Sequence, residues 1–348
     1  MNIETNYKID MRKYYLDSAE KYLIKSKTEP ENEEEYIKKA EDLIEKARIQ
    51  LILMKKQSYE LEKKPKTKFK DIAGLEKLKQ SIKLKIIEPL KKPELFKYFG
   101  KKIGGGILMY GPPGCGKSLI AEATAGEAEL KYFNIKASDI KSKYVGETEK
   151  NIAKLFDEAR KNQPCIIFFD EFESIGQERT TAQNPDKSMV SQLLTEIDSM
   201  GTKDQQILLL AATNEPWNID LALRRSGRFT ETLFVPPPDK ETREQIIKQY
   251  LKNKPIEEYI DYNLISSNTI IYSGADLIEI CNKAIEKVIS ECLDNNKIRK
   301  IRTSDILEQV KIHNKSITKE WFKKAINFAR NEETFNEIND YLENKAMN

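Results

Sequence analysis

Histidine is almost absent from this chain, and its scarcity excludes several classes of enzyme. His313 is the single histidine among 348 residues. Most histidine-dependent chemistry is therefore removed, including Ser-His-Asp hydrolysis and the HExxH zinc site. We interpret His313 as an ordinary surface residue.

Cysteines and long apolar runs are also scarce. The four cysteines are too scattered for a disulfide scaffold or a CxxC metal pair. The longest apolar runs, such as Ile207 to Ala212, are far shorter than the roughly 18 residues that span a bilayer. The first residues also lack the apolar core of a signal peptide. We expect a soluble, cytoplasmic protein with no membrane span.

An excess of one charge is missing as well. Lysine and arginine total 59 against 56 aspartate and glutamate residues, which gives a net charge of +3. The two signs are interspersed, whereas proteins that bind nucleic acid usually carry basic blocks. A short basic cluster at residues 63–70 is the exception. We do not expect a nucleic-acid partner.

Residues 1–64 are expected to form a helical hairpin, because they are rich in Lys, Glu, Ile and Leu and nearly free of Gly and Pro. An antiparallel first helix carrying Leu16, Ala19 and Leu23 would cover the apolar seam of the second. That seam repeats at spacings of three and four and consists of Ile37, Ala40, Ile44, Ala47, Leu51 and Met54. The hairpin is a candidate for recruiting a substrate or an adaptor, and residues 63–70 resemble a linker.

Residues 65–238 are expected to form an α/β domain. Short aliphatic runs alternate there with helical stretches, a pattern typical of a parallel sheet with crossover helices. The expected strands are 106–110, 132–135, 165–169, 206–212 and 231–235. Residues 239–313 then predict a small helical lid domain and residues 314–348 predict C-terminal helices, with helices at 240–251, 275–292, 303–311 and 319–329.

A phosphate-binding loop is predicted between the first expected strand and the helix that follows it. Its glycines let backbone N–H groups approach phosphate oxygens at the positive end of a helix. Lys117 would neutralise the β and γ phosphates, and Ser118 would ligate magnesium. The expected nucleotide-binding residues of this loop are Gly111, Pro112, Pro113, Gly114, Cys115, Gly116, Lys117, Ser118 and Leu119.

Two further apolar strands end in polar residues, where a parallel sheet places its ligands. The run ending at Phe169 is followed by Asp170, expected to hold magnesium, and Glu171, expected to act as general base on the attacking water. The other run is followed by Thr213 and Asn214, and Asn214 is expected to position that water near the γ phosphate. Together these motifs predict a magnesium-dependent ATPase.

In this order and spacing the motifs resemble the AAA ATPase family, from about Phe69 to His313. Either the Cdc48- and Vps4-like classes or the proteasome-regulatory-like class fits the chain. The resemblance implies contacts of Ile72, Ala73, Gly274 and Ala275 with the base. It also implies that Arg225 and Arg228 are arginine fingers that act in a neighbouring subunit, usually within a hexameric ring. The segment Ser142-Lys143-Tyr144-Val145-Gly146-Glu147 resembles the family's first pore loop, with Lys143, Tyr144 and Val145 gripping the substrate.

The resemblance implies an ATP-driven ring that remodels, unfolds or disassembles proteins by pore-loop threading. A nucleic-acid remodelling ATPase of the loader or initiator type and a proteasome-activating unfoldase stay open as alternatives. The last residues, 345–348, lack the hydrophobic-Tyr-x ending with which proteasome-activating rings dock. Retention of Glu171, Asn214 and both arginines disfavours a scaffold that does not hydrolyse ATP.

Overall fold

The chain divides into two compact units, Met1–Glu60 and Leu61–Asn348. The computed structural model describes residues 3–57, 61–62, 64–100, 105–141, 147–177, 184–201, 206–225, 227–330 and 334–342. Among these residues no helix is both long enough and apolar enough to cross a membrane.

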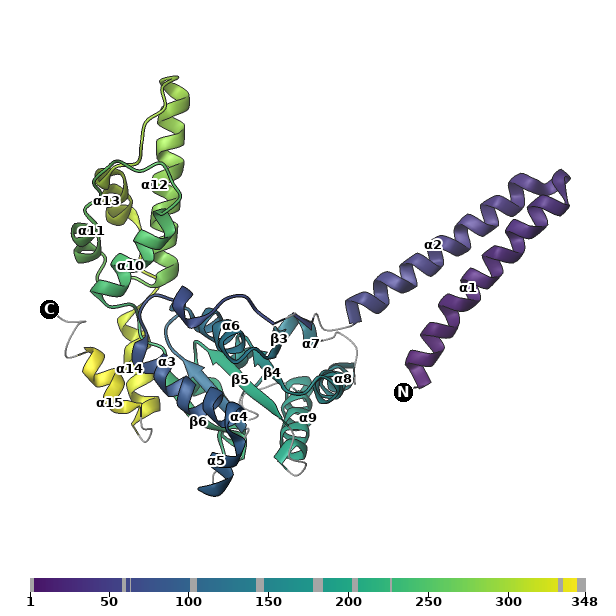
Figure 1. Cartoon of the computed structure of the whole chain (residues 1–348), viewed down its shortest axis with the longest axis horizontal. Coiled ribbons are helices and arrows are strands. Elements are labelled where there is room, and N and C mark those ends of the chain that lie inside the picture. The colour runs from purple at the N-terminus through teal and green to yellow at the C-terminus, as the bar shows by residue number, and fades with distance from the viewer. Residues whose placement is uncertain are drawn as a thin grey trace. The chain divides into compact units, whose positions relative to one another are not determined.

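The first unit is a hairpin of two helices, α1 (Ile3–Thr28) and α2 (Glu33–Gln57), joined through a 3-10 turn at Pro30–Asn32 (Figure 1). Alanines form the centre of the seam, because Ala19, Ala40 and Ala47 are at most 3% exposed. Small side chains let the two backbones approach closely. The larger apolar residues expected in the seam lie at its edges and are 37–44% exposed, namely Leu16, Leu23, Ile37 and Ile44.

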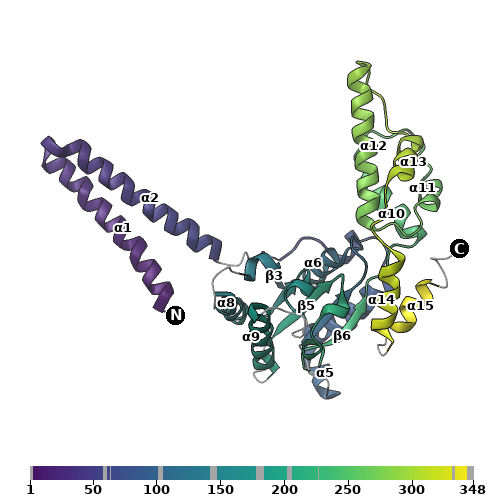
Figure 2. The same cartoon turned by 180° about the vertical axis from the view of Figure 1, so that it is seen from behind.

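The second unit contains a six-stranded sheet with the order β1-β3-β4-β5-β2-β6. Figures 1 and 2 show this sheet flanked by helices. Five strands are parallel, as expected. They are β2 (Gly105–Tyr110), β3 (Lys131–Ile135), β4 (Cys165–Phe169), β5 (Ile207–Thr213) and β6 (Phe229–Phe234). The short edge strand β1 (Leu61–Glu62) pairs antiparallel with β3. We had expected these two residues to be helical, and that prediction was wrong.

Both faces of the sheet are covered by helices. On one face, Phe168 of β4 and Leu210 of β5 share a core with Ile82 of α3 (Glu76–Ile82) and Ile120 of α6 (Lys117–Ala128). Successive strand residues point to opposite faces, and the fully buried Ile167 therefore faces the other layer. Helix α8 (Glu147–Lys161) packs beside β4 and contacts α9 (Asn184–Gly201). The remaining short helices are α4 (Glu88–Lys91), α5 (Pro93–Tyr98) and α7 (Ala137–Ile140), and a π-helical turn spans Lys83–Ile87.

The segment expected to be a linker packs closely against α6. A Cβ added to Gly126 would lie 2.0 Å from the carbonyl oxygen of Thr67 and 2.9 Å from that of Pro65. The Thr67 hydroxyl donates a hydrogen bond of 2.6 Å to Glu122. Only glycine at position 126 allows this close approach.

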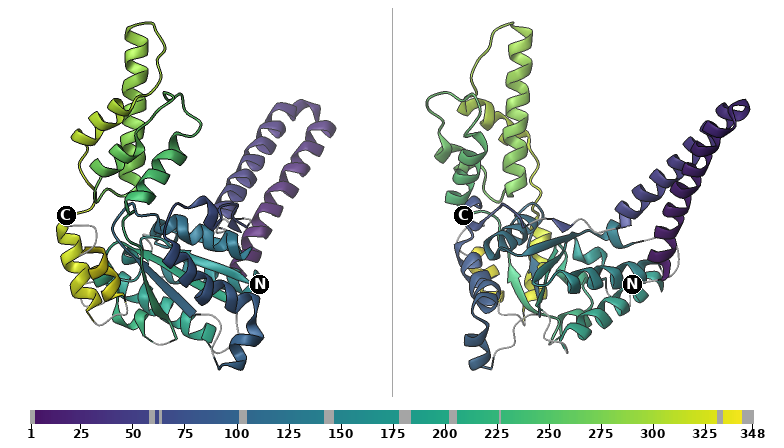
Figure 3. Two further views of the ribbon diagram at one scale, coloured as in Figure 1. Left: turned by 60° about the vertical axis from the view of Figure 1, so that its left-hand side comes forward. Right: turned by 45° about the vertical axis from the view of Figure 1, so that its right-hand side comes forward.

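The lid helices enclose a second core (Figure 3). They are α10 (Lys240–Leu251), α11 (Tyr262–Asn268), α12 (Gly274–Asp294) and α13 (Thr303–Ile312). The chain then continues into α14 (Lys319–Ala329) and α15 (Phe335–Tyr341), whose buried residues Trp321, Phe322 and Ile338 belong to the core of the sheet. The C-terminal helices therefore belong structurally to the large domain.

Candidate nucleotide-binding site

The three polar motifs expected from the sequence follow the carboxyl ends of three adjacent strands. The glycine-rich loop follows β2, Asp170 follows β4 and Asn214 follows β5, and the strand order at this place is β4-β5-β2. Tyr110 and Thr213, the last residues of β2 and β5, are register partners. The fold therefore brings the motifs to one edge of the sheet, where parallel sheets bind ligands.

Glycines give the loop between β2 and α6 its shape. Gly114 and Gly116 have positive φ angles of 73° and 86°, and a Cβ on Gly114 would lie 2.6 Å from the Ser273 hydroxyl. Helix α6 begins after Gly116, and no side chain caps it. Its first backbone N–H groups are therefore left for a ligand, and the helix dipole favours an anion there. In the same loop Pro112 and Cys115 are buried, Pro113 is half-buried and Leu119 is exposed.

Lys117 is a buried cation held by backbone oxygens. Its side chain donates hydrogen bonds of 2.9 Å to the Gly111 carbonyl and 2.7 Å to the Pro112 carbonyl. Burial lowers the pKa of Lys117 to about 8, against the opposing effect of Cys115, Glu173 and Asp170. Because a buried cation without a close counterion is costly, an anionic phosphate fits this position.

Ser118 and Asp170 form a candidate magnesium site. The Ser118 hydroxyl donates a hydrogen bond of 2.8 Å to Asp170 Oδ2, and Asp170 Oδ1 accepts one of 3.0 Å from the backbone N–H of Glu171. A hydroxyl and a carboxylate are hard oxygen ligands, which suit magnesium when phosphate and water complete the shell. No group of three or more His, Cys, Asp or Glu side chains suited to a metal was found in the described part of the chain. The Ser118 hydroxyl and the Asp170 carboxylate fit a magnesium ion whose other ligands are phosphate and water oxygens.

Glu171 lies at the exposed end of β4 with a φ of 48°, in the left-handed region. This conformation is uncommon for a residue with a side chain, and it is found often at functional sites. The backbone thus turns immediately after Asp170. The exposed Glu171 carboxylate can accept a proton from water.

Asn214 is held through both of its backbone groups, by two residues that our sequence reasoning missed. Its N–H donates to Glu173 Oε1 at 3.4 Å, and its carbonyl oxygen accepts a hydrogen bond of 2.7 Å from Trp321 Nε1. The other carboxylate oxygen of Glu173 is buried and has no hydrogen-bond partner in the described residues. Glu173 lies only two residues after Glu171, and this closeness to the predicted base was the sequence signal for a role at the site. Nothing in the sequence near Trp321 points to Asn214.

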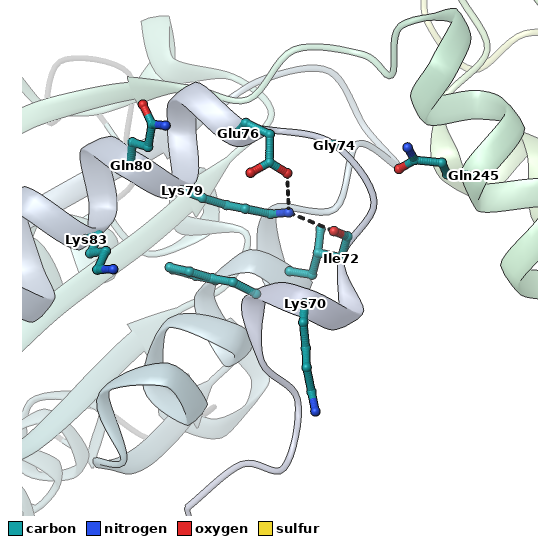
Figure 4. Close-up of a pocket in the computed structure, with 9 residues that line it drawn as sticks. Lys70, Ile72, Gly74, Glu76, Lys79, Gln80, Lys83 and Gln245 are labelled. Atoms are coloured by element: carbon teal, nitrogen blue, oxygen red, sulfur yellow. Dashed lines mark hydrogen bonds and ion pairs between the residues drawn. The ribbon is translucent and has the colours of Figure 1, made fainter.

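Ile72 and Ala73 precede Gly74 in the segment expected to contact the base. Lys79 Nζ donates a hydrogen bond of 2.8 Å to the Ile72 carbonyl and pairs with Glu76 at 2.8 Å, as Figure 4 shows. This buried lysine fixes the backbone of the segment. A cavity of about 450 Å³ opens beside it, lined by residues that include Ile72 and Lys79. None of the phosphate-loop residues lines this cavity.

The lid helix α12 contacts the phosphate loop directly. The backbone N–H of Ala275 donates a hydrogen bond of 3.2 Å to the Gly114 carbonyl. Ser273 caps the helix and forms a capping box with Asp276. Gly274 and Ala275 therefore lie beside the phosphate loop, and their contact with the base stays a prediction.

His313 is not a surface residue, and our interpretation of it was wrong. Its side chain is 6% exposed, and Nε2 lies 3.1 Å from Asp276 Oδ1. The Ser316 hydroxyl donates to the other carboxylate oxygen of Asp276 at 2.8 Å. Burial raises the pKa of Asp276, but hydrogen bonds from Ser273, His313 and Ser316 outweigh it and hold that pKa below its ordinary value. His313 thus ties the end of α13 to the beginning of α12.

The two expected arginine fingers have different surroundings. Arg228 forms a bidentate ion pair with Asp198 at 2.7 and 2.8 Å and donates to the Ala222 carbonyl at 2.7 Å. Arg225 is exposed, and its guanidinium has no partner among the residues that the structure describes. Of these two arginines, only Arg225 presents a guanidinium without a partner among the described residues. The expected pore-loop residues Lys143, Tyr144 and Val145 lie outside the described residues.

Comparison with known proteins agrees with this geometry. Residues 107–237 match the model of the family described as "ATPase family associated with various cellular activities (AAA)". Residues 107–237 are therefore similar to the ATPase domain of this family, and the similarity supports nucleotide binding and ATP hydrolysis.

A Plasmodium falciparum (isolate 3D7) protein called "Putative cell division cycle ATPase" is 39% identical over 238 residues. The match covers 68% of this chain and 19% of that protein. The chain thus spans about a fifth of the length of this relative, and the similarity extends well beyond the 131 residues of the family match.

Proposed function

We propose that this chain is the subunit of a ring-forming ATPase that binds ATP with Mg²⁺ and remodels, unfolds or disassembles protein substrates. The buried Lys117 between two backbone carbonyls carries the nucleotide-binding part of the proposal, because a phosphate would supply the negative charge that this cation lacks. Ser118 and Asp170 would hold Mg²⁺, which polarises phosphoryl oxygens when bound. Glu171 would take the proton of the attacking water, and Asn214 would orient that water.

Assembly into a ring is proposed because both expected arginine fingers would act in a neighbouring subunit. Phosphoryl transfer concentrates negative charge that an arginine finger offsets, and such a finger can come from a neighbouring subunit. The exposed guanidinium of Arg225, which has no partner among the described residues, supports this role. Arg228 would have to leave Asp198 to act in the same way. We propose a hexamer as the ring, following the family resemblance.

Threading of a polypeptide is proposed for the segment 142–147. Its aromatic residue Tyr144 precedes a valine and a glycine, and in the sequence it lies between α7 and α8. An aromatic side chain binds many sequences through apolar burial without directional contacts. The hairpin would recruit substrates, and its exposed Leu16, Leu23, Ile37 and Ile44 supply apolar area for that contact.

The proposal is tested by asking which polymer stimulates the ATPase. ATP hydrolysis by the assembled full chain is measured alone, with a permanently unfolded polypeptide, and with single-stranded or duplex DNA. Stimulation by polypeptide alone supports protein remodelling. Stimulation by DNA alone would overturn it in favour of a nucleic-acid remodeller. A Glu171→Gln variant, which should bind ATP without hydrolysing it, should retain the polypeptide in a stable complex.

A further inference from the structure

Trp321 is far in sequence from the nucleotide site, yet it contacts the backbone next to it. Its indole nitrogen donates to the Asn214 carbonyl at 2.7 Å. The indole is 8% exposed and packs against Phe234, with ring centroids 6.4 Å apart and planes inclined by 18°. Trp217, three residues after Asn214, lies with its ring centroid 6.1 Å from that of Trp321. The donor is therefore fixed in place by aromatic packing on two sides.

The C-terminal segment that carries Trp321 also contacts the carboxyl end of β2, the strand beside β5. Phe328 of α14 packs edge-on against Tyr110, the last residue before the phosphate loop. The hydroxyl groups of Tyr110 and Thr334 lie 2.5 Å apart in a buried hydrogen bond. The guanidinium of Arg224, the residue before Arg225, lies over the ring of Phe328, 4.7 Å from the ring centroid. Helices α14 and α15 therefore brace several strand ends that carry the site.

We propose that Trp321 is a positioning residue for ATP hydrolysis, acting through Asn214. This inference rests on the proposed ATPase function and on the proposed role of Asn214 toward the attacking water. Glu173 holds the N–H of Asn214 and Trp321 holds its carbonyl, so the peptide groups on both sides of this residue are fixed. Fixing the backbone limits how far the Asn214 side chain can move. Misplacement of a catalytic group by about 1 Å can reduce a rate by about 100-fold.

The role predicts a specific kinetic signature. Replacing Trp321 by Phe keeps an aromatic ring against Phe234 but removes the N–H donor. We expect kcat to fall by about tenfold while the KM for ATP changes by less than about twofold, because a positioning group acts in the transition state more than in binding. Lys323→Ala is the matched control, since Lys323 is an exposed residue of the same helix. It should leave both constants unchanged.

A double-mutant cycle separates positioning from simple support of the fold. In an Asn214→Ala background, Trp321→Phe should cause no further loss of kcat, because the residue that Trp321 positions is already gone. Effects that multiply in the double mutant would overturn the proposal, and so would an unchanged kcat in Trp321→Phe. If Trp321→Phe lowers Tm strongly, benzothienylalanine at position 321, which has the shape of tryptophan without the N–H donor, replaces it in the cycle.

The experiments distinguish failure of the proposed ATPase function from failure of the proposed role of Trp321. Absence of ATPase activity in the assembled wild-type chain would overturn the proposed function together with this inference. A wild-type rate in Asn214→Ala would remove the role of Asn214, and with it that of Trp321, while leaving the ATPase in place. A reduced kcat in Asn214→Ala with an unaffected Trp321→Phe variant would overturn the inference alone.

Discussion

Arg228 is joined to Asp198 by two hydrogen bonds of 2.7 and 2.8 Å, which gives it a structural role within its own chain. The neighbouring finger candidate, Arg225, has no such partner among the described residues. Replacing the two arginines should therefore affect protein stability differently. Arg228 is held within the chain that carries it, whereas the guanidinium of Arg225 is left for the proposed contact with another subunit.

Arg225→Ala should lower kcat of the assembled ring by at least about 10³-fold, the range in which arginine fingers contribute, and should leave Tm unchanged. Arg228→Ala should in addition lower Tm by about 1–2 °C, since a largely exposed bidentate pair is worth about 1 kcal/mol at most. Steady-state ATPase assays and thermal unfolding measure both quantities. Mixing Arg225→Ala with Glu171→Gln subunits should restore some hydrolysis, and zero rescue in confirmed mixed rings would contradict action in trans.

The lowered pKa of Lys117 predicts that nucleotide affinity depends on pH. Below pH about 8 the free enzyme carries a charged Lys117, and affinity should be constant. As the pH rises above about 8 the free lysine loses its proton, so binding of phosphate must take one up and affinity falls by as much as about tenfold per pH unit. Titrating ATP into Glu171→Gln protein between pH 7 and 9.5 measures this. A dissociation constant that stays flat over that range would show that Lys117 keeps its ordinary pKa.

Lys117→Ala and Glu171→Gln should separate binding from turnover. The first removes the cation for the phosphates and should abolish nucleotide binding. The second keeps that cation and removes the base, so it should bind ATP and not hydrolyse it. Fluorescent-nucleotide binding and phosphate release distinguish the two, and a normal rate in Glu171→Gln protein would remove Glu171 from the role of base.

His313→Ala should destabilise the lid. It leaves the buried Asp276 carboxylate with one hydrogen-bond donor fewer, a loss that costs about 1–3 kcal/mol. Because α12 also contacts Gly114, nucleotide affinity should fall as well. The exposed neighbour Lys311 supplies the control variant Lys311→Ala. Equal Tm values for the two variants would show that the contact between His313 and Asp276 does not stabilise the lid.

Local patterns predicted most of the fold and the place of the phosphate loop between β2 and α6, whereas the roles of the site residues stay predictions. The aliphatic strands, the lid helices α10, α12 and α13, and α14 lie within two residues of the predicted ranges, because hydrophobic periodicity and glycine or proline breaks act over short distances. The short lid helix α11 was not predicted. The phosphate loop is likewise one continuous segment. Trp321 and Asn214 are 107 residues apart, and His313 and Asp276 are 37 apart. Such partners meet only through tertiary packing, which a single sequence does not display.

The central claim is that this chain uses ATP hydrolysis to thread and unfold polypeptides. Substitution of Tyr144 tests this claim most directly. Tyr144→Ala should keep the ring and most of the basal ATPase, because no phosphate-binding motif includes this residue. Unfolding of a tagged model protein by that variant is the decisive measurement. We predict that unfolding is lost in Tyr144→Ala and retained in Tyr144→Phe, since apolar burial of the ring, worth about 1.5–3 kcal/mol, supplies the grip and the hydroxyl does not. Unfolding by Tyr144→Ala at the wild-type rate would contradict the threading account.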